Sequence, residues 1–347
     1  MNLIYNHGNP YQQLMYSDRT GRVRLEAGAK GLLGQLCAAP VSDRPRAVHV
    51  HWDDRMFGRN PDREANEASA EAILGDLAQY RADGGRVVWT VHNRIAHASR
   101  DTETLLAARR RLADLADLVH VHAAHAAAYV ADEYDVRPER LCIAPHPSYL
   151  GAYEPAEATV SRPIAEGPTQ FLHFGYFRGN KGSDEVVRAA GALSGRDTFD
   201  WRLSIIGRAF RSGLRTLRMA DKLPNVTASG EMIPDEEIPA LFGGANFYVA
   251  PFRDLFTSGS IMLALTYGLP VLGPNTPAMR ESTPKDCHDL LYANDGHPRR
   301  LLQAMTAAGQ MDRAEREARR AACFRFARER APEAMSRILM RAIEDVL

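Results

Sequence analysis

The chain of 347 residues is longer than one hydrophobic core usually accommodates, so two domains are the first expectation. Its 43 Lys and Arg balance 43 Asp and Glu, which argues against a large positively charged surface that binds nucleic acid. The 45% of hydrophobic residues indicates a globular chain. No apolar run spans a bilayer, the N-terminus lacks signal-peptide features and the four cysteines form no CxxC pair, so we expect a cytoplasmic protein without a disulfide framework.

Short β-branched runs alternate with amphipathic stretches along the first part of the chain, which is typical of parallel strands covered by helices. Strands are predicted at 2–5, 23–26, 47–52, 86–92, 118–122 and 140–144. Helices are predicted at 62–83, 101–116 and 124–134. Residues 1–150 are therefore expected to form an N-terminal Rossmann-like domain.

A stretch rich in proline and glycine, 151–167, interrupts this pattern and is predicted to be an interdomain linker. The alternation then resumes. Strands are predicted at 170–175, 201–207, 226–228, 246–250, 270–272 and 290–292, and helices at 184–195, 211–221, 236–243, 259–267 and 298–309. We expect a C-terminal Rossmann-like domain over 168–325 and closing helices over 326–347. The predicted fold class is α/β, with two doubly wound domains that face a central cleft.

Ligands bind doubly wound sheets where strands lead into helices. The turn HFGYFRGNKGS follows a predicted strand that ends at Gly175 and precedes a helix that opens near residue 183. Its glycines allow backbone amides to approach a ligand, and Arg178 and Lys181 place positive charge beside a helix N-terminus, as a phosphate requires. Neither a Walker A sequence nor GxGxxG is present. A turn with solvated cations is the plain alternative.

Two further turns carry donors for an anion. Arg208 follows the strand 201–207 directly, although a surface ion pair would also explain it. The run Thr257, Ser258, Gly259 and Ser260 precedes a helix. One hydroxyl suffices for an N-cap, so this set favours a bound anion. Three such turns at the edge of one sheet suit a diphosphate between a nucleoside and a sugar.

Four segments in register carry a family resemblance over roughly 168–295. They are the turn from Gly175 to Gly182, the strand RLSIIG, the stretch ASGEMIPDEEIPALFGGANFYVAPF and the segment TSGSIMLALTYGLPV. In content and order they resemble the donor-binding domain of glycosyltransferases with the GT-B architecture, family 4 in particular. The variant TSGS is similar to that of bacterial exopolysaccharide enzymes. The first half resembles this branch more loosely, through NPY, HVHWDD, VVWTVHNRIAH and IAPHPSY.

The resemblance implies a hexosyltransferase of polysaccharide biosynthesis. The second domain would hold a nucleotide sugar, with UDP or GDP as the nucleotide, and the first would face a glycan or lipid-linked saccharide. Such enzymes usually lack a catalytic metal or cofactor, so Arg178, Lys181, Arg208 and the loop at Ser258–Ser260 would stabilise the departing diphosphate. The family's arginine after the first glycine is Tyr176 here, and the second glutamate of its E-x7-E pair falls at Leu263.

Candidate residues on the acceptor side follow the strands of the first half. His92 and His97 lie in one turn, and either could accept a proton or bind the sugar. Asp53 follows a neighbouring strand as a candidate general base. Each also has a structural interpretation, as a strand-end residue bonded to backbone or as a cap. The H-x-H pairs at 49/51 and 120/122 are compatible with buried polar residues or, less well, with zinc.

Two other functions stay open at this point. A sugar-nucleotide epimerase shares the architecture, and a non-catalytic partner subunit would explain the missing glutamates. The arginines at 109–111 are expected on the solvated face of a helix, with contact to a membrane surface at the inner face as the alternative.

Overall fold

The computed structural model describes residues 2–4, 10–18, 20–21, 23–24, 26–28, 45–53, 56–57, 60–95, 100–177, 181–196, 198–210 and 213–347. The chain divides into two compact units, Met1–His146 together with Pro332–Leu347, and Pro147–Ala331. Each unit contains a six-stranded parallel sheet, as the alternating pattern predicts. No helix in these ranges is both long and apolar enough to cross a bilayer.

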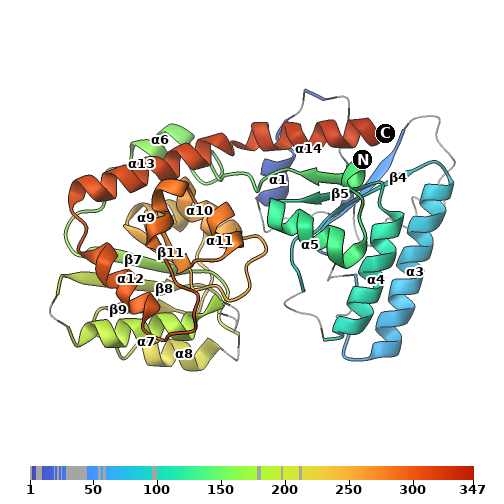
Figure 1. The fold of residues 1–347 in the computed structure, drawn as a ribbon. Coiled ribbons are helices and arrows are strands. Elements are labelled where there is room, and N and C mark those ends of the chain that lie inside the picture. Colours follow the sequence, from blue (N-terminus) through green and yellow to red (C-terminus); the bar gives the residue numbers. More distant parts are fainter. Residues whose placement is uncertain are drawn as a thin grey trace. The chain divides into compact units, whose positions relative to one another are not determined.

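The first unit has the strand order β2-β1-β3-β4-β5-β6, and every pairing is parallel. Figure 1 labels two of these strands, β4 and β5. Its strands are β1 Asn2–Ile4, β2 Glu26–Gly28, β3 Ala47–Val50, β4 Arg86–Thr90, β5 Leu118–Val121 and β6 Leu141–Ile143. Its helices are α1 Tyr11–Met15, α3 Arg63–Ala82, α4 Thr102–Leu115, α5 Ala124–Tyr134 and α14 Pro332–Val346. The strands lie close to their predicted positions, apart from β2, which begins at the last residue of the predicted run.

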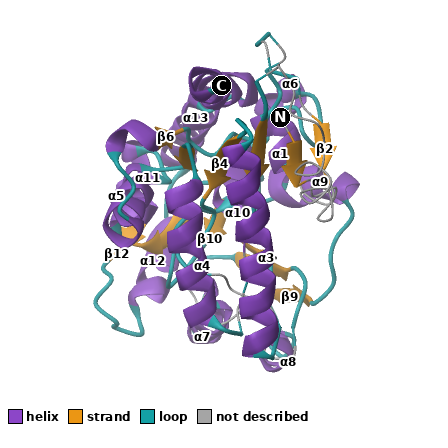
Figure 2. Cartoon of the chain, turned by 90° about the vertical axis from the view of Figure 1, so that its right-hand side faces the viewer, coloured by secondary structure: helices purple, strands orange, loops and turns teal. Residues whose placement is uncertain are grey.

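Helices α3 and α4 lie side by side (Figure 2). Each begins at an aspartate whose carboxylate accepts from a backbone amide one turn into the helix: Asp62 from Glu64 and Asp101 from Thr104. The short helix α1, which no sequence pattern indicated, packs against α14. The chain's last helix thus belongs to the first unit, whereas α13 Arg313–Glu329 belongs to the second.

The second unit has the strand order β12-β11-β10-β7-β8-β9. Its strands are β7 Thr169–Phe174, β8 Trp201–Ile206, β9 Val226–Ser229, β10 Phe247–Val249, β11 Val271–Pro274 and β12 Leu291–Tyr292. Its remaining helices are α6 Ala156–Ser161, α7 Ser183–Ser194, α8 Leu214–Ala220, α9 Ile238–Gly243, α10 Gly259–Thr266, α11 Pro277–Glu281 and α12 Arg300–Gly309. Short 3-10 helices occupy Pro138–Arg140 in the first unit and Asp235–Glu237 and Lys285–Leu290 in the second.

The order of the second sheet reverses at β7, because β8 and β9 lie on one side of it and β10 to β12 on the other. Helices α7 and α12 pack together, and α10 packs on α13. In open parallel sheets the crevice at such a reversal, beyond the carboxyl ends of the strands, is the usual ligand position. The turns after β7, β8 and β10 meet there. The helix α6 lies inside the stretch predicted to be a linker.

Candidate functional site

The turns after β7, β8 and β10 touch one another through their backbones. Gly207 ends β8 with φ 143°, and a Cβ at this position would lie 2.0 Å from the carbonyl oxygen of Gly175. Gly182 caps α7 with φ 66°, and its Cβ would lie 2.3 Å from the carbonyl oxygen of Pro251, just after β10. Only glycine fits either position, since both φ angles and both contacts exclude a side chain. The glycines therefore bring three donor-bearing turns together.

Lys181 lies at this junction, immediately before the N-terminus of α7. Its ammonium nitrogen is 3.7 Å from the centroid of the Phe252 ring, which belongs to the turn after β10. Arg208 is exposed beyond β8, with its guanidinium 5.9 Å from the centroid of Phe210. Arg178 falls outside the described residues. The cation of the first turn is thus in contact with the third turn.

A histidine that the sequence analysis did not single out ties these turns together. His173 is buried in β7, and its Nδ1 donates to the carbonyl of Val249 in β10 at 2.8 Å. Because Nδ1 carries the proton, Nε2 accepts from the hydroxyl of Ser183, the first residue of α7, also at 2.8 Å. Burial, and to a smaller extent the charge of Lys181, lower the pKa of His173 to about 4, although the hydrogen bond to Val249 acts in the opposite direction. A neutral imidazole therefore anchors the start of α7.

The N-terminus of α10 carries the hydroxyl residues that the sequence indicated. The Ser258 hydroxyl accepts from the amide of Ile261 at 3.4 Å and lies 3.1 Å from the hydroxyl of Ser260. Tyr248 in β10 donates to the carbonyl of Phe174 at 2.8 Å. Burial raises the pKa of Tyr248, and hydrogen bonding by Ser260 acts in the opposite direction. Ser260, Tyr248 and the end of β7 are therefore neighbours.

The residues predicted to hold the donor thus gather at the carboxyl edge of the second sheet. Those in the described ranges are Gly175, Lys181, Arg208, Thr257, Ser258, Gly259 and Ser260. Where the resembled family has its glutamate pair, this chain has apolar side chains: Leu263 and Leu255 are both buried. Backbone amides, hydroxyls and a lysine can bind an anion at this edge, so the site is suited to a phosphate group.

Two cavities lie in the second unit, and the smaller of them adjoins this edge of the sheet. One of about 300 Å³ lies at the ends of β10, β11 and β12, with Arg188, Arg253, Glu185 and Tyr292 in its lining. Arg253 pairs with Asp184 in the first turn of α7 at 2.9 Å. Burial raises the pKa of Glu185, whose carboxylate accepts from the Tyr292 hydroxyl at 3.3 Å.

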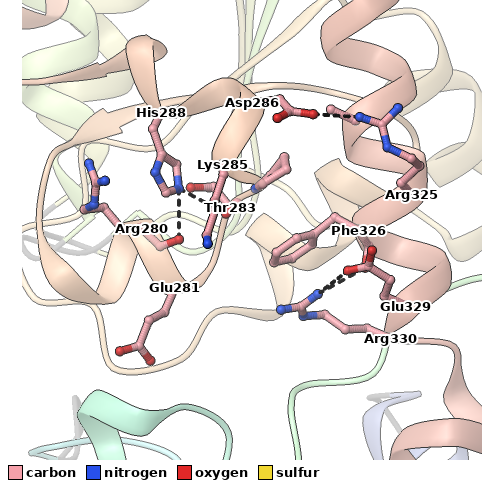
Figure 3. A pocket seen from close by; sticks show the side chains of 12 residues that line it. Arg280, Glu281, Thr283, Lys285, Asp286, His288, Arg325, Phe326, Glu329 and Arg330 are labelled. Atoms are coloured by element: carbon pink, nitrogen blue, oxygen red, sulfur yellow. Dashed lines mark hydrogen bonds and ion pairs between the residues drawn. The ribbon is translucent and has the colours of Figure 1, made fainter.

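The other cavity, of about 740 Å³, lies between α11, the turn after it and α13 (Figure 3). His288 Nε2 donates toward the carbonyls of Arg280 and Thr283 at 3.1 and 3.2 Å, and Asp286 pairs with Arg325 at 2.7 Å. Through these contacts His288, Asp286 and Arg325 are already paired with other groups of the protein. None of the residues predicted to bind the donor lines this cavity.

In the first unit, His92 and Asp53 follow β4 and β3, whereas His97 falls outside the described residues. The indole ring of Trp52 stacks on the His92 ring, with centroids 4.9 Å apart and an interplanar angle of 10°. Trp52 has φ 47°, a left-handed conformation that costs a non-glycine residue energy and that often marks functional sites. Burial lowers the pKa of His92, so its imidazole is neutral near pH 7.

Asp53 is engaged in a buried ion pair. Its two carboxylate oxygens accept from Nε and Nη2 of Arg109 at 2.5 and 3.2 Å, and both side chains are 1% exposed. Arg109 also donates to the carbonyls of Asn93 and Arg94, next to His92. The prediction that all three arginines at 109–111 lie on a solvated helix face is wrong for Arg109, because the helix turns it toward Asp53. The pair fixes the turn that carries His92.

The histidines of the H-x-H pairs form hydrogen bonds to His92, to the hydroxyls of Tyr11, Tyr16 and Thr90, and to the carbonyl of Ala144. In the described part of the chain, no group of three or more His, Cys, Asp or Glu could hold a metal ion.

Comparison with known proteins agrees with this geometry. Residues 168–310 match the family model of glycosyl transferases group 1. A GDP-mannose:glycolipid 4-beta-D-mannosyltransferase of Xanthomonas campestris pv. campestris is 25% identical over 232 residues, which cover 65% of this chain and 60% of that protein. The chain thus matches less than two thirds of that relative's length.

Solved structures resemble the chain over most of its length. Anabaena HepE, in complex with UDP and glucose, has a TM-score of 0.65 at 12% identity, covering 99% of this chain and 91% of HepE. A UDP-forming trehalose-phosphate synthase from Burkholderia xenovorans has a TM-score of 0.65 at 13% identity, covering 91% of this chain and 78% of the synthase. The predicted GT-B architecture is therefore confirmed. Residues 168–310 thus match glycosyl transferases group 1, and the chain as a whole has the GT-B fold of these structures.

Proposed function

We propose that this protein transfers a hexose from a nucleoside diphosphate sugar to a glycan or a lipid-linked saccharide, as a family-4-like enzyme of bacterial polysaccharide biosynthesis. One observation carries the proposal: Lys181, the capping serine of α10 and the glycine turns share one edge of the second sheet, at its topological switch point. Clustered anion donors of this kind have no structural necessity, since one hydroxyl satisfies the helix cap.

In the proposed reaction, the acceptor hydroxyl oxygen attacks the anomeric carbon of the donor. The bond from that carbon to the diphosphate oxygen breaks, and its electron pair leaves with the nucleoside diphosphate. Lys181, Arg208 and the N-terminus of α10 stabilise the charge that develops on the leaving group, without a metal cofactor. The hydroxyl proton passes to a base on the first unit.

His92 is the stronger candidate for this base. Its ring is neutral near pH 7 and lies at the carboxyl edge of the first sheet, beside the strained Trp52. Asp53 has both oxygens bound to Arg109, which suits it to holding the turn rather than to accepting a proton. His97 stays a prediction, as a contact to the sugar.

GDP-mannose is the first donor to test, because the curated relatives are named as GDP-mannose-dependent transferases with a glycolipid acceptor. UDP-glucose is the second, since the similar HepE structure contains UDP and glucose. With a lipid-linked acceptor, the enzyme would work at the cytoplasmic face of a membrane.

The test is to incubate the purified protein with GDP-, UDP- and dTDP-sugars, with and without lipid-linked saccharides, and to measure release of the nucleoside diphosphate. Transfer or slow donor hydrolysis supports the proposal. Interconversion of the sugar would identify an epimerase, and binding without turnover would identify a non-catalytic subunit. Lys181→Ala should lower turnover about 100-fold. Lys222→Ala, at an exposed lysine after α8, is the matched control and should leave it unchanged.

A further inference from the structure

A continuous hydrogen-bonded chain of side chains crosses one face of the first sheet and ends at His92. It links three adjacent strands, and a phenol from the C-terminal end of α1 lies within it. From His92, the first bond joins its Nε2 to His51 Nδ1 at 2.9 Å, and the second joins His51 Nε2 to the Tyr16 hydroxyl at 2.7 Å. The Tyr16 hydroxyl also bonds to His49 Nδ1 at 2.7 Å, and His49 Nε2 bonds to the Thr90 hydroxyl at 2.7 Å. The Thr90 hydroxyl bonds to His120 Nδ1 at 2.9 Å, and His120 Nε2 bonds to the carbonyl oxygen of Ala144 at 3.0 Å.

The carbonyl at one end sets the direction of the first bonds. A carbonyl oxygen only accepts, so His120 Nε2 carries the proton that it donates to Ala144. In a neutral ring Nδ1 is then an acceptor, and the single proton of the Thr90 hydroxyl is donated to it. The Thr90 oxygen in turn accepts from His49 Nε2.

The same reasoning continues to the other end. His49 Nδ1 is an acceptor, so Tyr16 donates to it, and the phenol oxygen accepts from His51 Nε2. His51 Nδ1 therefore accepts from His92 Nε2. His92 is left with the proton on Nε2 and a lone pair on Nδ1. Among the residues that the structure describes, this Nδ1 has no hydrogen-bond partner, whereas both ring nitrogens of His49, His51 and His120 have one.

The opposite direction is penalised at one point. In the reversed direction, His49 Nε2 would be an acceptor and would need the single hydroxyl proton of Thr90. His120 Nδ1 would need the same proton, because His120 keeps its own proton on Nε2 to donate to Ala144. One buried acceptor would then lack a donor, or His120 would turn a lone pair toward the Ala144 oxygen. An unsatisfied polar atom in this buried face is costly, so the carbonyl selects one of the two directions.

We propose that this chain is a positioning device: it fixes His92 as the Nε2–H tautomer, so that its Nδ1 lone pair can accept the proton of the acceptor hydroxyl. The inference deepens the proposed function and rests on it. His51 would orient His92 as the carboxylate of a catalytic triad orients the triad's histidine. Here a series of neutral, hydrogen-bonded side chains takes the place of the carboxylate. Aligned hydrogen bonds also polarise one another, which increases the basicity of the terminal Nδ1.

The surroundings of His92 support a neutral, oriented ring. Trp52 stacks on one face, Tyr11 contacts the ring edge-on with centroids 5.2 Å apart, and the ring of His122 lies 5.8 Å away. His51, His120, His146 and Arg109 are the other titratable groups near it, and together with burial they lower its pKa. No carboxylate among the described residues contacts the ring, so the orientation of its protons depends on His51.

Thr90 offers the sharpest test, because Thr90→Val keeps the shape of the side chain and removes the hydroxyl. His49 would then avoid a buried unpaired N–H by moving its proton to Nδ1, which reverses the bonds through Tyr16 and His51 and places the proton of His92 on Nδ1. We expect kcat to fall about tenfold with little change in KM for the donor. Thr90→Ser retains the hydroxyl and should keep kcat within about twofold of the wild type.

The tautomers are measured directly by ¹⁵N NMR of histidine-labelled protein, with the His92 signal assigned from a His92→Gln sample. The inference predicts Nε2–H for His92 in the wild type and in Thr90→Ser, and Nδ1–H in Thr90→Val. An Nδ1–H tautomer in the wild type, or equal kcat in the Val and Ser variants, would overturn it. The spectra are informative even if no sugar transfer is found, so failure of the chain and failure of the proposed function can be told apart.

Discussion

Acidification from pH 7.5 to 5.5 should unfold this protein through its buried histidines. Burial lowers the pKa of six of them, of which His120 and His173 fall to about 4 from a usual 6.5. The other four are His49, His51, His92 and His122. Each stays neutral in the folded state but takes up a proton in the unfolded state once the pH falls below about 6.5. The stabilisation is therefore complete above that pH and is lost as the pH falls toward 4.

The size of the effect follows from the number of protons. At pH 5.5 an unfolded histidine carries about 0.9 proton, so six bind about 5 protons that the folded state does not bind. The free energy of unfolding should then change by about 7 kcal/mol per pH unit at pH 5.5, and by about 8 kcal/mol in total between pH 7.5 and 5.5. This is comparable with the whole stability of a typical domain, about 5–15 kcal/mol.

The assay is urea unfolding at a series of pH values, followed by tryptophan fluorescence. Trp89 in β4 and Trp201 in β8 are both buried, so each unit has a reporter. The slope of the unfolding free energy against pH gives the number of protons taken up. A slope near pH 5.5 that corresponds to the uptake of fewer than about two protons on unfolding would refute the reasoning, because the histidines would then be charged in the folded protein.

Three further outcomes are expected. Arg109→Met should lower the free energy of unfolding by about 3–5 kcal/mol, since Asp53 stays buried without its partner, and urea titration measures the loss. Gly207→Ala should cost at least about 2 kcal/mol by the same titration, whereas Gly191→Ala, inside α7 with only one contact at 3.8 Å, should stabilise by about 0.5–1 kcal/mol. Ser258→Ala should remove about 1 kcal/mol of helix capping and also weaken nucleotide binding measured by calorimetry, and unchanged binding would exclude this residue from the site.

Much of the fold could be predicted because the local patterns are strong. Runs such as Ala47–Val50 and Leu118–Val121 are buried at every position and lie between amphipathic stretches, as in parallel sheets. The donor turns could be found because glycine, lysine and hydroxyl residues cluster at the ends of predicted strands. The position of the last helix, α14, could not be predicted, since the apolar face of a helix does not indicate which of the two sheets the helix covers.

The details of the first unit depended on contacts between distant residues. Three consecutive arginines point in different directions around a helix, so Arg109 faces inward, but its partner Asp53 is 56 positions away in sequence. The left-handed Trp52 has no signature in the sequence. The histidine pairs were visible as a period-two pattern, whereas Tyr16 and Thr90, which join them, gave no signal of their own.

The most direct measurement of the central claim is a crystal structure of the protein with GDP or UDP bound. The account predicts diphosphate oxygens within about 3 Å of Lys181 Nζ and of the backbone amides at the start of α10. A diphosphate held instead in the cavity beside Arg280 and Lys285, with Lys181 making no contact to it, would contradict the assignment of the donor site.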